Sequence, residues 1–232
     1  MRRVEHWLVV LVMAVLSAGC HLPKTGIKPA ENFSSRTNYP AQWWTPVLTN
    51  GAPSWEIFPQ DAGPGEVILS KRNELGLLSN FAATPFEFRG RRYASVEGFW
   101  QMMKYPESPA DPRVTFPGLT WPYTREEVSQ MTAFQARYAG DAASKNMRQM
   151  GIDWVTFEGR RLEYGAPGES KFYKLIVAAM HAKVQQNPEV KKVLLATGNL
   201  ILKADHHQET NVPAAWRYYD IWMKIRDELR GK

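Results

Sequence analysis

The stretch from Ser95 to Lys104 places an acid, an amide, a cation and an aromatic ring at helical spacing. Read as a helix, it puts Glu97, Gln101 and Lys104 at i, i+4 and i+7, so the three side chains share one face. Trp100 follows Glu97 by one turn, on nearly the same side. Such a face could ionise, orient, neutralise and stack a small molecule. The spacing therefore predicts a small-molecule site with Glu97 as its acid.

The residues around this face agree with a helix that begins at Ser95. Ser95 is a good N-cap residue, which places Glu97 in the first turn, where the helix dipole favours a carboxylate. Phe99, Met102 and Met103 are left to fill the opposite, buried side. An alternative stays open, because Glu97 and Lys104 could be an ordinary solvated pair, with Trp100 in the core.

Several short elements must position this helix. Residues 67–69 form a short apolar strand, and 86–88 and 92–94 alternate around Arg89-Gly90, which indicates a hairpin that leads into Ser95. Residues 105–123 contain five prolines, which predicts a loop. A capping box at Thr124 begins another helix, which runs toward Met150-Gly151.

The second half of the chain is expected to be mainly helical. Glycines interrupt residues 154–168, and the predicted elements that follow are a helix over 169–186, a helix over 189–197, a buried strand over 200–202 and a final helix over 214–229. No internal repeat and no second domain is evident. The fold class predicted is α+β: a predominantly helical single domain with a few short strands.

The N-terminus has the pattern of a bacterial lipoprotein signal. Arg2 and Arg3 precede an apolar run from Trp7 to Val15, and small residues lead to Cys20, the one cysteine of the chain. We therefore expect a signal peptide over 1–19, a tether and irregular segment over 20–65, and the domain over 66–232. A plain signal peptide or a membrane anchor is the alternative, although the apolar run is short for a span.

Lipidation of Cys20 gives the first testable prediction. His21 follows the cysteine, a sorting pattern that predicts the bacterial cell envelope, at the outer membrane facing the periplasm. We expect Cys20→Ser to abolish labelling with a fatty-acid analogue and to release the protein from membranes. Unchanged labelling and membrane retention would contradict the lipid anchor.

Composition and charge limit the kinds of ligand that the chain is expected to bind. The formal net charge is +6, and removing residues 1–19, which hold two Arg and one Glu, lowers it to +5 without leaving a long basic run. This mild excess could attract an anionic ligand, but it predicts no specific nucleic acid. Adjacent His206 and His207 would point to opposite faces of a strand, so no metal site is predicted, and no cofactor is expected.

Several motifs, in one order along the chain, resemble the NADAR/YbiA-like family. They are Leu78–Phe81, Ser95–Lys104, Ala142–Gly151, His181–Lys183, Leu194–Gly198 and Met223–Arg226. The resemblance implies a YbiA-like fold and N-glycosidase chemistry on ribosyl or ADP-ribosyl compounds. The resemblance is weaker at two places. Many members carry a Glu after the strand that follows the Thr-Gly turn, and here Asp205 would have to take its place. The segment before the last helix, which ends at Trp216, is shorter than in many members.

This resemblance implies roles for the site residues. Glu97 would stabilise the positive charge that develops on the sugar, with Lys104, Lys183 and Asp205 as further catalytic residues. The two lysines would hold phosphate or assist the leaving group. The predicted substrate-binding residues are Asn80 and Gln101, which would bind ribose hydroxyls or the base edge, and Phe81 and Trp100, which would stack on the base.

Two other functions stay open at this point. The chain could be a non-catalytic envelope lipoprotein that binds a nucleotide-like or sugar ligand in the same cleft, which the departures near Asp205 and Trp216 favour. It could also be a structural envelope protein whose Trp-rich N-terminal segment holds a partner. The family's substrates are cytoplasmic compounds, which a secreted lipoprotein would meet less often.

Overall fold

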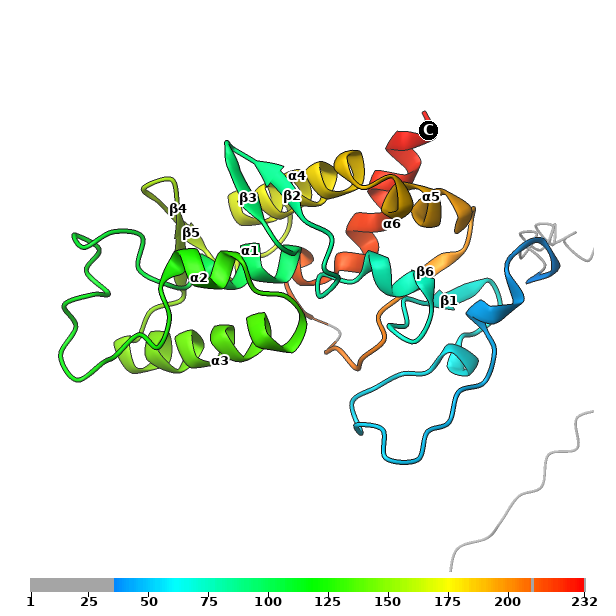
Figure 1. Ribbon diagram of the computed structural model, residues 1–232, viewed down its shortest axis with the longest axis horizontal. Coiled ribbons are helices and arrows are strands. Elements are labelled where there is room, and N and C mark those ends of the chain that lie inside the picture. Colours follow the sequence, from blue (N-terminus) through cyan, green and yellow to red (C-terminus); the bar gives the residue numbers. More distant parts are fainter. Residues whose placement is uncertain (1–35, 210, 232) are drawn as a thin grey trace, which may run out of the picture. The chain divides into compact units, whose positions relative to one another are not determined.

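The computed structural model describes residues 36–209 and 211–231, and Figure 1 shows their arrangement. The helices are α1 (Val96–Met102), α2 (Arg125–Ser129), α3 (Ala133–Met150), α4 (Lys171–Gln186), α5 (Pro188–Ala196) and α6 (Tyr218–Leu229). The strands are β1 (Glu66–Ile68), β2 (Phe86–Phe88), β3 (Arg91–Tyr93), β4 (Trp154–Phe157), β5 (Arg160–Glu163) and β6 (Ile201–Lys203). This confirms the predicted α+β class. No helix among the described residues is long and apolar enough to cross a membrane, and Cys20 lies outside them.

The strands form three separate pairs. β1 pairs in parallel with β6, with Val67 opposite Leu202. β2 and β3 form the predicted hairpin around Arg89-Gly90. β4 and β5 form a second hairpin, which the glycine pattern of residues 154–168 did not predict. Its turn residues, Glu158 and Gly159, both have positive φ, as a two-residue hairpin turn of the I′ type requires.

Helix α1 is surrounded by protein rather than lying on the surface. Ser95 is its N-cap, as predicted: the hydroxyl accepts from the Gly98 N–H at 2.9 Å and donates to the Met131 carbonyl at 2.8 Å. All seven residues of α1 are buried, because α2, α3 and α4 pack around it (Figure 1). A Cβ at Gly98 would lie 2.5 Å from the Met131 carbonyl oxygen, so only glycine allows this approach.

Two helices predicted as continuous are interrupted. The helix that begins at Thr124 stops after Ser129, and α3 begins at Ala133, whose φ of 49° is in the left-handed region. The C-terminal helix begins as a short 3-10 turn over Ala214–Trp216 and restarts as α6 at Tyr218. Propensity continues through both breaks, so packing and not local sequence sets them.

The segment before β1 contributes to the core. It contains three short 3-10 turns, η1 (Arg36–Asn38), η2 (Ala41–Trp43) and η3 (Pro59–Asp61), and a fourth, η4 (Glu74–Leu78), follows β1. Trp43 and Trp44 are buried, and their indole N–H groups donate to Glu74 at 2.6 Å and to the Glu66 carbonyl at 2.9 Å. Trp55, in the same segment, is 41% exposed.

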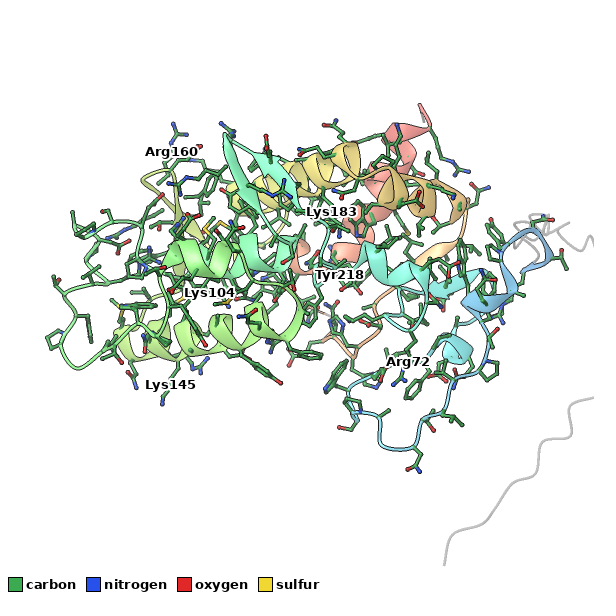
Figure 2. All side chains as sticks on the ribbon, viewed as in Figure 1. Arg72, Lys104, Lys145, Arg160, Lys183 and Tyr218 are labelled. Carbon is green, nitrogen blue, oxygen red and sulfur yellow. The ribbon has the colours of Figure 1, made fainter. Side chains whose placement is uncertain are left out.

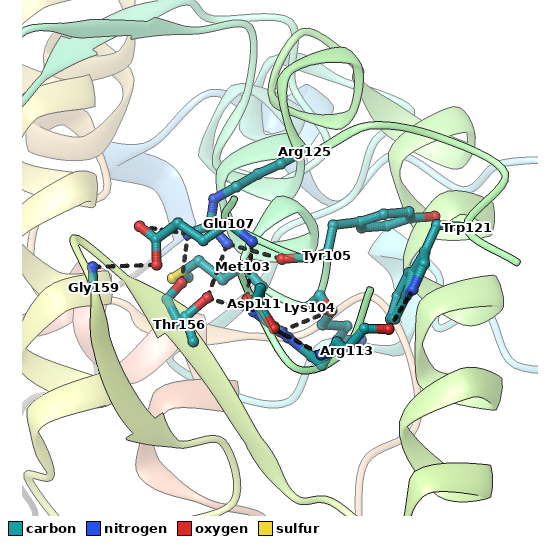
Figure 3. A network of polar contacts seen from close by, with 10 residues as sticks. All are labelled: Met103, Lys104, Tyr105, Glu107, Asp111, Arg113, Trp121, Arg125, Thr156 and Gly159. Carbon is teal, nitrogen blue, oxygen red and sulfur yellow. Dashed lines mark hydrogen bonds and ion pairs between the residues drawn. The ribbon is translucent and has the colours of Figure 1, made fainter. Parts of the chain in front are cut away.

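A buried arginine organises the loop over residues 105–123 (Figure 3). Arg113 donates to both oxygens of Asp111, at 2.9 and 2.6 Å, and is fully buried. It also donates to the carbonyls of Met103 and Lys104, at 3.2 and 3.0 Å, at the C-terminal end of α1. Its Nη2 lies 2.5 Å from the Thr156 hydroxyl on β4. One side chain therefore ties the loop to both elements.

Candidate functional site

Glu97 lies at the centre of a buried polar group. Its carboxylate is 7% exposed and accepts a 2.7 Å hydrogen bond from the Gln101 amide, one helical turn later. Its own N–H donates to the Asn80 carbonyl at 2.9 Å, which joins α1 to the segment after η4. Burial raises the pKa of Glu97, against the opposing effects of the Gln101 hydrogen bond and the Lys104 charge.

Two buried amide oxygens are left unpaired, on the side chains of two residues that hydrogen-bond to Glu97. Gln101 Oε1 and Asn80 Oδ1 are buried and have no hydrogen-bond partner among the described residues. A Cβ at Gly140 on α3 would lie 1.9 Å from Gln101 Oε1, so the glycine is what leaves room for this amide. Buried unpaired acceptors are costly and therefore rare. Both are suited to accept hydrogen bonds from ligand hydroxyl groups.

Lys104 completes the charged pair predicted with Glu97, although it lies just beyond the end of α1. Its Nζ donates to the Ser144 hydroxyl at 2.9 Å and lies 4.9 Å above the Tyr164 ring. Burial lowers the pKa of Lys104 to about 8, while the Glu97 charge acts in the opposite direction. The two groups are coupled electrostatically, yet no ion pair within 4 Å joins them in the described part of the chain.

The structure places Trp100 in the core rather than at a ligand. Its indole N–H donates to the Tyr164 hydroxyl at 2.8 Å, and it is 6% exposed. Its ring makes T-shaped contacts with the rings of Tyr164 and Phe172, with interplanar angles of 87° and 83°. These contacts leave it no open face, so the role proposed from the sequence, stacking on a base, is left to Phe81.

Asp205 is brought to the same region by a long-range ion pair. Its Oδ2 pairs with Lys71, which follows β1, and its Oδ1 lies 3.1 Å from Nδ1 of His206. Burial alone would raise the pKa of Asp205, but the hydrogen bond from His206 and the Lys71 charge lower it overall. Each oxygen of Asp205 therefore already has one partner, which fixes the orientation of this carboxylate.

His206 has a polar neighbour at each ring nitrogen. Nδ1 lies 3.1 Å from the Asp205 carboxylate, and Nε2 lies 3.3 Å from the Gln208 amide nitrogen. The imidazole stacks on Tyr218 of α6, with ring centroids 6.1 Å apart and planes inclined by 6°. No group of three or more His, Cys, Asp and Glu side chains that could bind a metal ion is found in residues 36–209 and 211–231.

Lys183 lies in the core (Figure 2). The sequence had instead indicated a catalytic role for this residue. It is fully buried, and its Nζ donates to the Ser79 carbonyl at 2.9 Å and lies 5.6 Å from the Trp222 ring. Trp222 donates in turn to the Leu78 carbonyl at 2.5 Å. Both bonds fix the segment whose next residue, Asn80, accepts from Glu97. Lys183 therefore acts as a positioning residue in this geometry.

The burial of Lys183 predicts a pH-dependent stability. Desolvation lowers its pKa to about 7, from an ordinary value of 10.5. Between those values the folded state binds fewer protons than the unfolded state, so this group makes the free energy of unfolding rise with pH from about 7 to 10.5. In Lys183→Met we expect a smaller rise, measured by urea unfolding at several pH values.

An exposed lysine on the same helix provides the control. Lys174→Met should keep the wild-type pH dependence, because its side chain is solvated in both states. Equal slopes in wild type and Lys183→Met would show that the amine is not neutral in the fold.

The predicted site face of α1 does not line an open cleft. Glu97, Gln101 and Lys104 are 7, 6 and 5% exposed, so the predicted face is closed and not a wet cleft. A hollow of about 360 Å³ lies elsewhere, against α2 and β3. Its lining contains none of the predicted site residues: Arg91, Arg92, Tyr93, Met102, Arg125, Glu126, Ser129 and Gln130.

The residues that sequence reasoning missed come from distant segments. Lys71 and Asp205 are 134 positions apart, and no local pattern connects them. Ser144 and Tyr164, which contact Lys104, lie on α3 and just after β5. Tyr218 lies at the start of α6, where the sequence had indicated only an apolar helix face. Asn80 was found from the sequence, because it lies in the motif Leu78–Phe81.

Among solved structures, one similar protein is found. No protein-family model and no curated protein matches the chain. The chain is similar to the E. coli protein YbiA, determined by NMR, at 19% sequence identity. The match covers 73% of this chain and 88% of YbiA, with a TM-score of 0.41. A likeness at this level says nothing about function.

Proposed function

We propose that the chain is an N-glycosidase-type hydrolase that acts on the N-glycosidic bond of a ribosyl or ADP-ribosyl compound. The observation that carries the proposal is the buried pair of Glu97 and Lys104. Burial raises the pKa of the acid and lowers that of the base, which brings both nearer to neutral pH. Opposed shifts of this kind are typical of acid–base sites.

The reaction would use Glu97 as a carboxylate beside the anomeric carbon. As the C–N bond breaks, its electron pair leaves with the base nitrogen, and positive charge develops on the sugar. The carboxylate stabilises that charge, and water adds to the carbon. The proton that water loses ends on the departing base. Lys104, in its charged form below about pH 8, is placed to neutralise a phosphate or the leaving group.

The unpaired amides supply the binding contacts in this proposal. Gln101 Oε1 and Asn80 Oδ1 would accept hydrogen bonds from the ribose hydroxyls, which would satisfy both acceptors. The choice of an N-glycosidic bond comes from the sequence motifs around these residues. Because the face is closed, ligand entry would require movement of the segments around α1.

A turnover screen tests the proposal. The full chain in detergent would be incubated with NAD, ADP-ribose and ribosylated bases, and chromatography would measure released base. We expect release from at least one compound, and none above background with Glu97→Gln. Binding by calorimetry without release in any case would overturn the catalytic proposal and support a non-catalytic ligand-binding lipoprotein.

A further inference from the structure

Four aromatic side chains form a partly exposed group beside the Glu97 site. Trp55, Phe134 and Tyr138 are 41, 45 and 66% exposed, and Phe81 is partly buried. The ring centroid of Phe134 lies 6.4 Å from that of Trp55, 5.3 Å from that of Phe81 and 6.0 Å from that of Tyr138. We call these four residues the aromatic shelf. Contiguous exposed aromatic surface often marks a binding site.

A strained backbone presents Phe134 in this group. Ala133, directly before it, has a φ of 49°, a left-handed conformation that L-residues other than Asn, Asp and Gly rarely adopt. The Ala133 N–H donates to the Phe81 carbonyl at 3.1 Å, which holds the first turn of α3 against the Phe81 segment. Strain of this kind persists where surrounding contacts enforce it, and it is frequent at ligand sites.

Trp55 is fixed on the other side of the shelf. The His207 N–H donates to the Trp55 carbonyl at 3.2 Å, and the Ile57 N–H donates to the Asp205 carbonyl at 2.8 Å. These bonds hold the segment of Trp55 and Ile57 against the segment of Asp205, which pairs with Lys71. Three segments distant in sequence are therefore held with their rings together at the surface.

Positive charge borders the shelf. Lys71 Nζ lies 5.1 Å from the Phe81 ring centroid and is 30% exposed while it pairs with Asp205. Arg137, between Phe134 and Tyr138 in sequence, is 54% exposed and pairs with Asp141 on the same helix. Both cations contribute to the electrostatic environment of Glu97.

We propose that the aromatic shelf binds the heteroaromatic base of an anionic nucleotide-like ligand by stacking, with Lys71 beside its phosphate. This inference deepens the proposed function, on which it rests for the identity of the ligand. A planar base can stack on the exposed ring of Phe134, which stands at 82° to the ring of Phe81, and the phosphate of the ligand matches the charge of Lys71 over the Phe81 ring. Trp100 is buried and cannot serve this purpose, so the shelf supplies the stacking surface that the proposed substrate needs.

Calorimetry with AMP and with ribose 5-phosphate tests the shelf directly. Both probes carry a phosphate, but only AMP carries a base. In the full chain in detergent, Phe134→Ala should weaken AMP binding by roughly 5- to 150-fold, the effect of losing one stacking ring. Phe134→Leu, which keeps apolar bulk without a flat ring, should also weaken it. Binding of ribose 5-phosphate should change less than about 2-fold in either variant.

Phe116→Ala is the matched control, because Phe116 is 38% exposed and lies in the loop over residues 105–123. It should bind AMP as wild type does. Wild-type protein that fails to bind AMP, or equal AMP affinity in wild type and both Phe134 variants, would overturn the shelf. Shelf-dependent AMP binding without base release from any compound would overturn only the proposed hydrolase. Base release with an unchanged KM in the Phe134 variants would overturn only the shelf.

Discussion

Glu97→Gln is expected to lower kcat by roughly two to four orders of magnitude on whichever compound the chain hydrolyses. The glutamine keeps the shape of the side chain and can still accept from Gln101, but it carries no charge. The sugar is positively charged only as the bond breaks, so the loss should appear in kcat. Ligand affinity, measured by calorimetry, should change by much less.

The same substitution should not destabilise the fold. Burial raises the pKa of Glu97, so ionising this carboxyl group costs more free energy in the folded protein than in the unfolded chain. A neutral glutamine removes that penalty, so the free energy of unfolding near pH 7 should be unchanged or higher. A group that lowers stability yet is required for turnover is typical of an active site.

A structural carboxylate supplies the control for this experiment. Glu74 accepts hydrogen bonds from Trp43 and Gln42 in the N-terminal part of the described chain, away from α1. Glu74→Gln should leave turnover intact. Near wild-type turnover in Glu97→Gln, or a large loss of its stability, would mean that Glu97 is a structural residue.

Local chemistry in the sequence predicted much of the fold. The Ser95 cap, the hairpin around Arg89-Gly90 and the helix end at residue 186 all lie where the sequence predicted them. The hairpin at Glu158-Gly159 was missed because a glycine there could equally be a chain break, and the glutamate adopts positive φ without a sequence signal. The break between α2 and α3 was missed for a similar reason, since Ala133 favours a helix by propensity.

The candidate site was predicted in its residues more than in its environment. Periodicity correctly grouped Glu97 with Gln101, but it could not show that α1 is enclosed on every side. Exposure depends on what packs against a helix, and α3 and α4 are far away in the sequence. For the same reason the sequence around Lys183 gave no sign that this lysine is fully buried. Contacts such as Lys71 with Asp205 depend on the tertiary fold alone.

Arg113→Met is expected to give the largest loss of stability, about 3–5 kcal/mol in the free energy of unfolding, because it leaves a buried carboxylate without its partner. Burial alone would raise the pKa of Asp111, yet the hydrogen bonds from Arg113 and from backbone N–H groups lower it to about 2. The substitution also removes the Arg113 hydrogen bonds to the Met103 and Lys104 carbonyls, of which Met103 keeps the one from the Thr156 N–H. Urea unfolding at pH 7 would measure the loss.

The double variant Asp111→Asn/Arg113→Met separates the ion pair from the packing. With the carboxylate removed, the loss should be smaller than the sum of the two single losses, which gives a coupling energy for the pair. Arg91→Met, an exposed arginine on β3, should change stability by less than about 0.5 kcal/mol. Because the pKa of Asp111 is lowered in the fold, the stabilisation from this pair is complete above the ordinary pKa of aspartate and is lost as the pH falls toward 2. The wild-type advantage over Arg113→Met should therefore shrink in acid. An equal difference at pH 7 and pH 3, or additive losses in the double variant, would show that Arg113 stabilises the loop by packing and not by its charge.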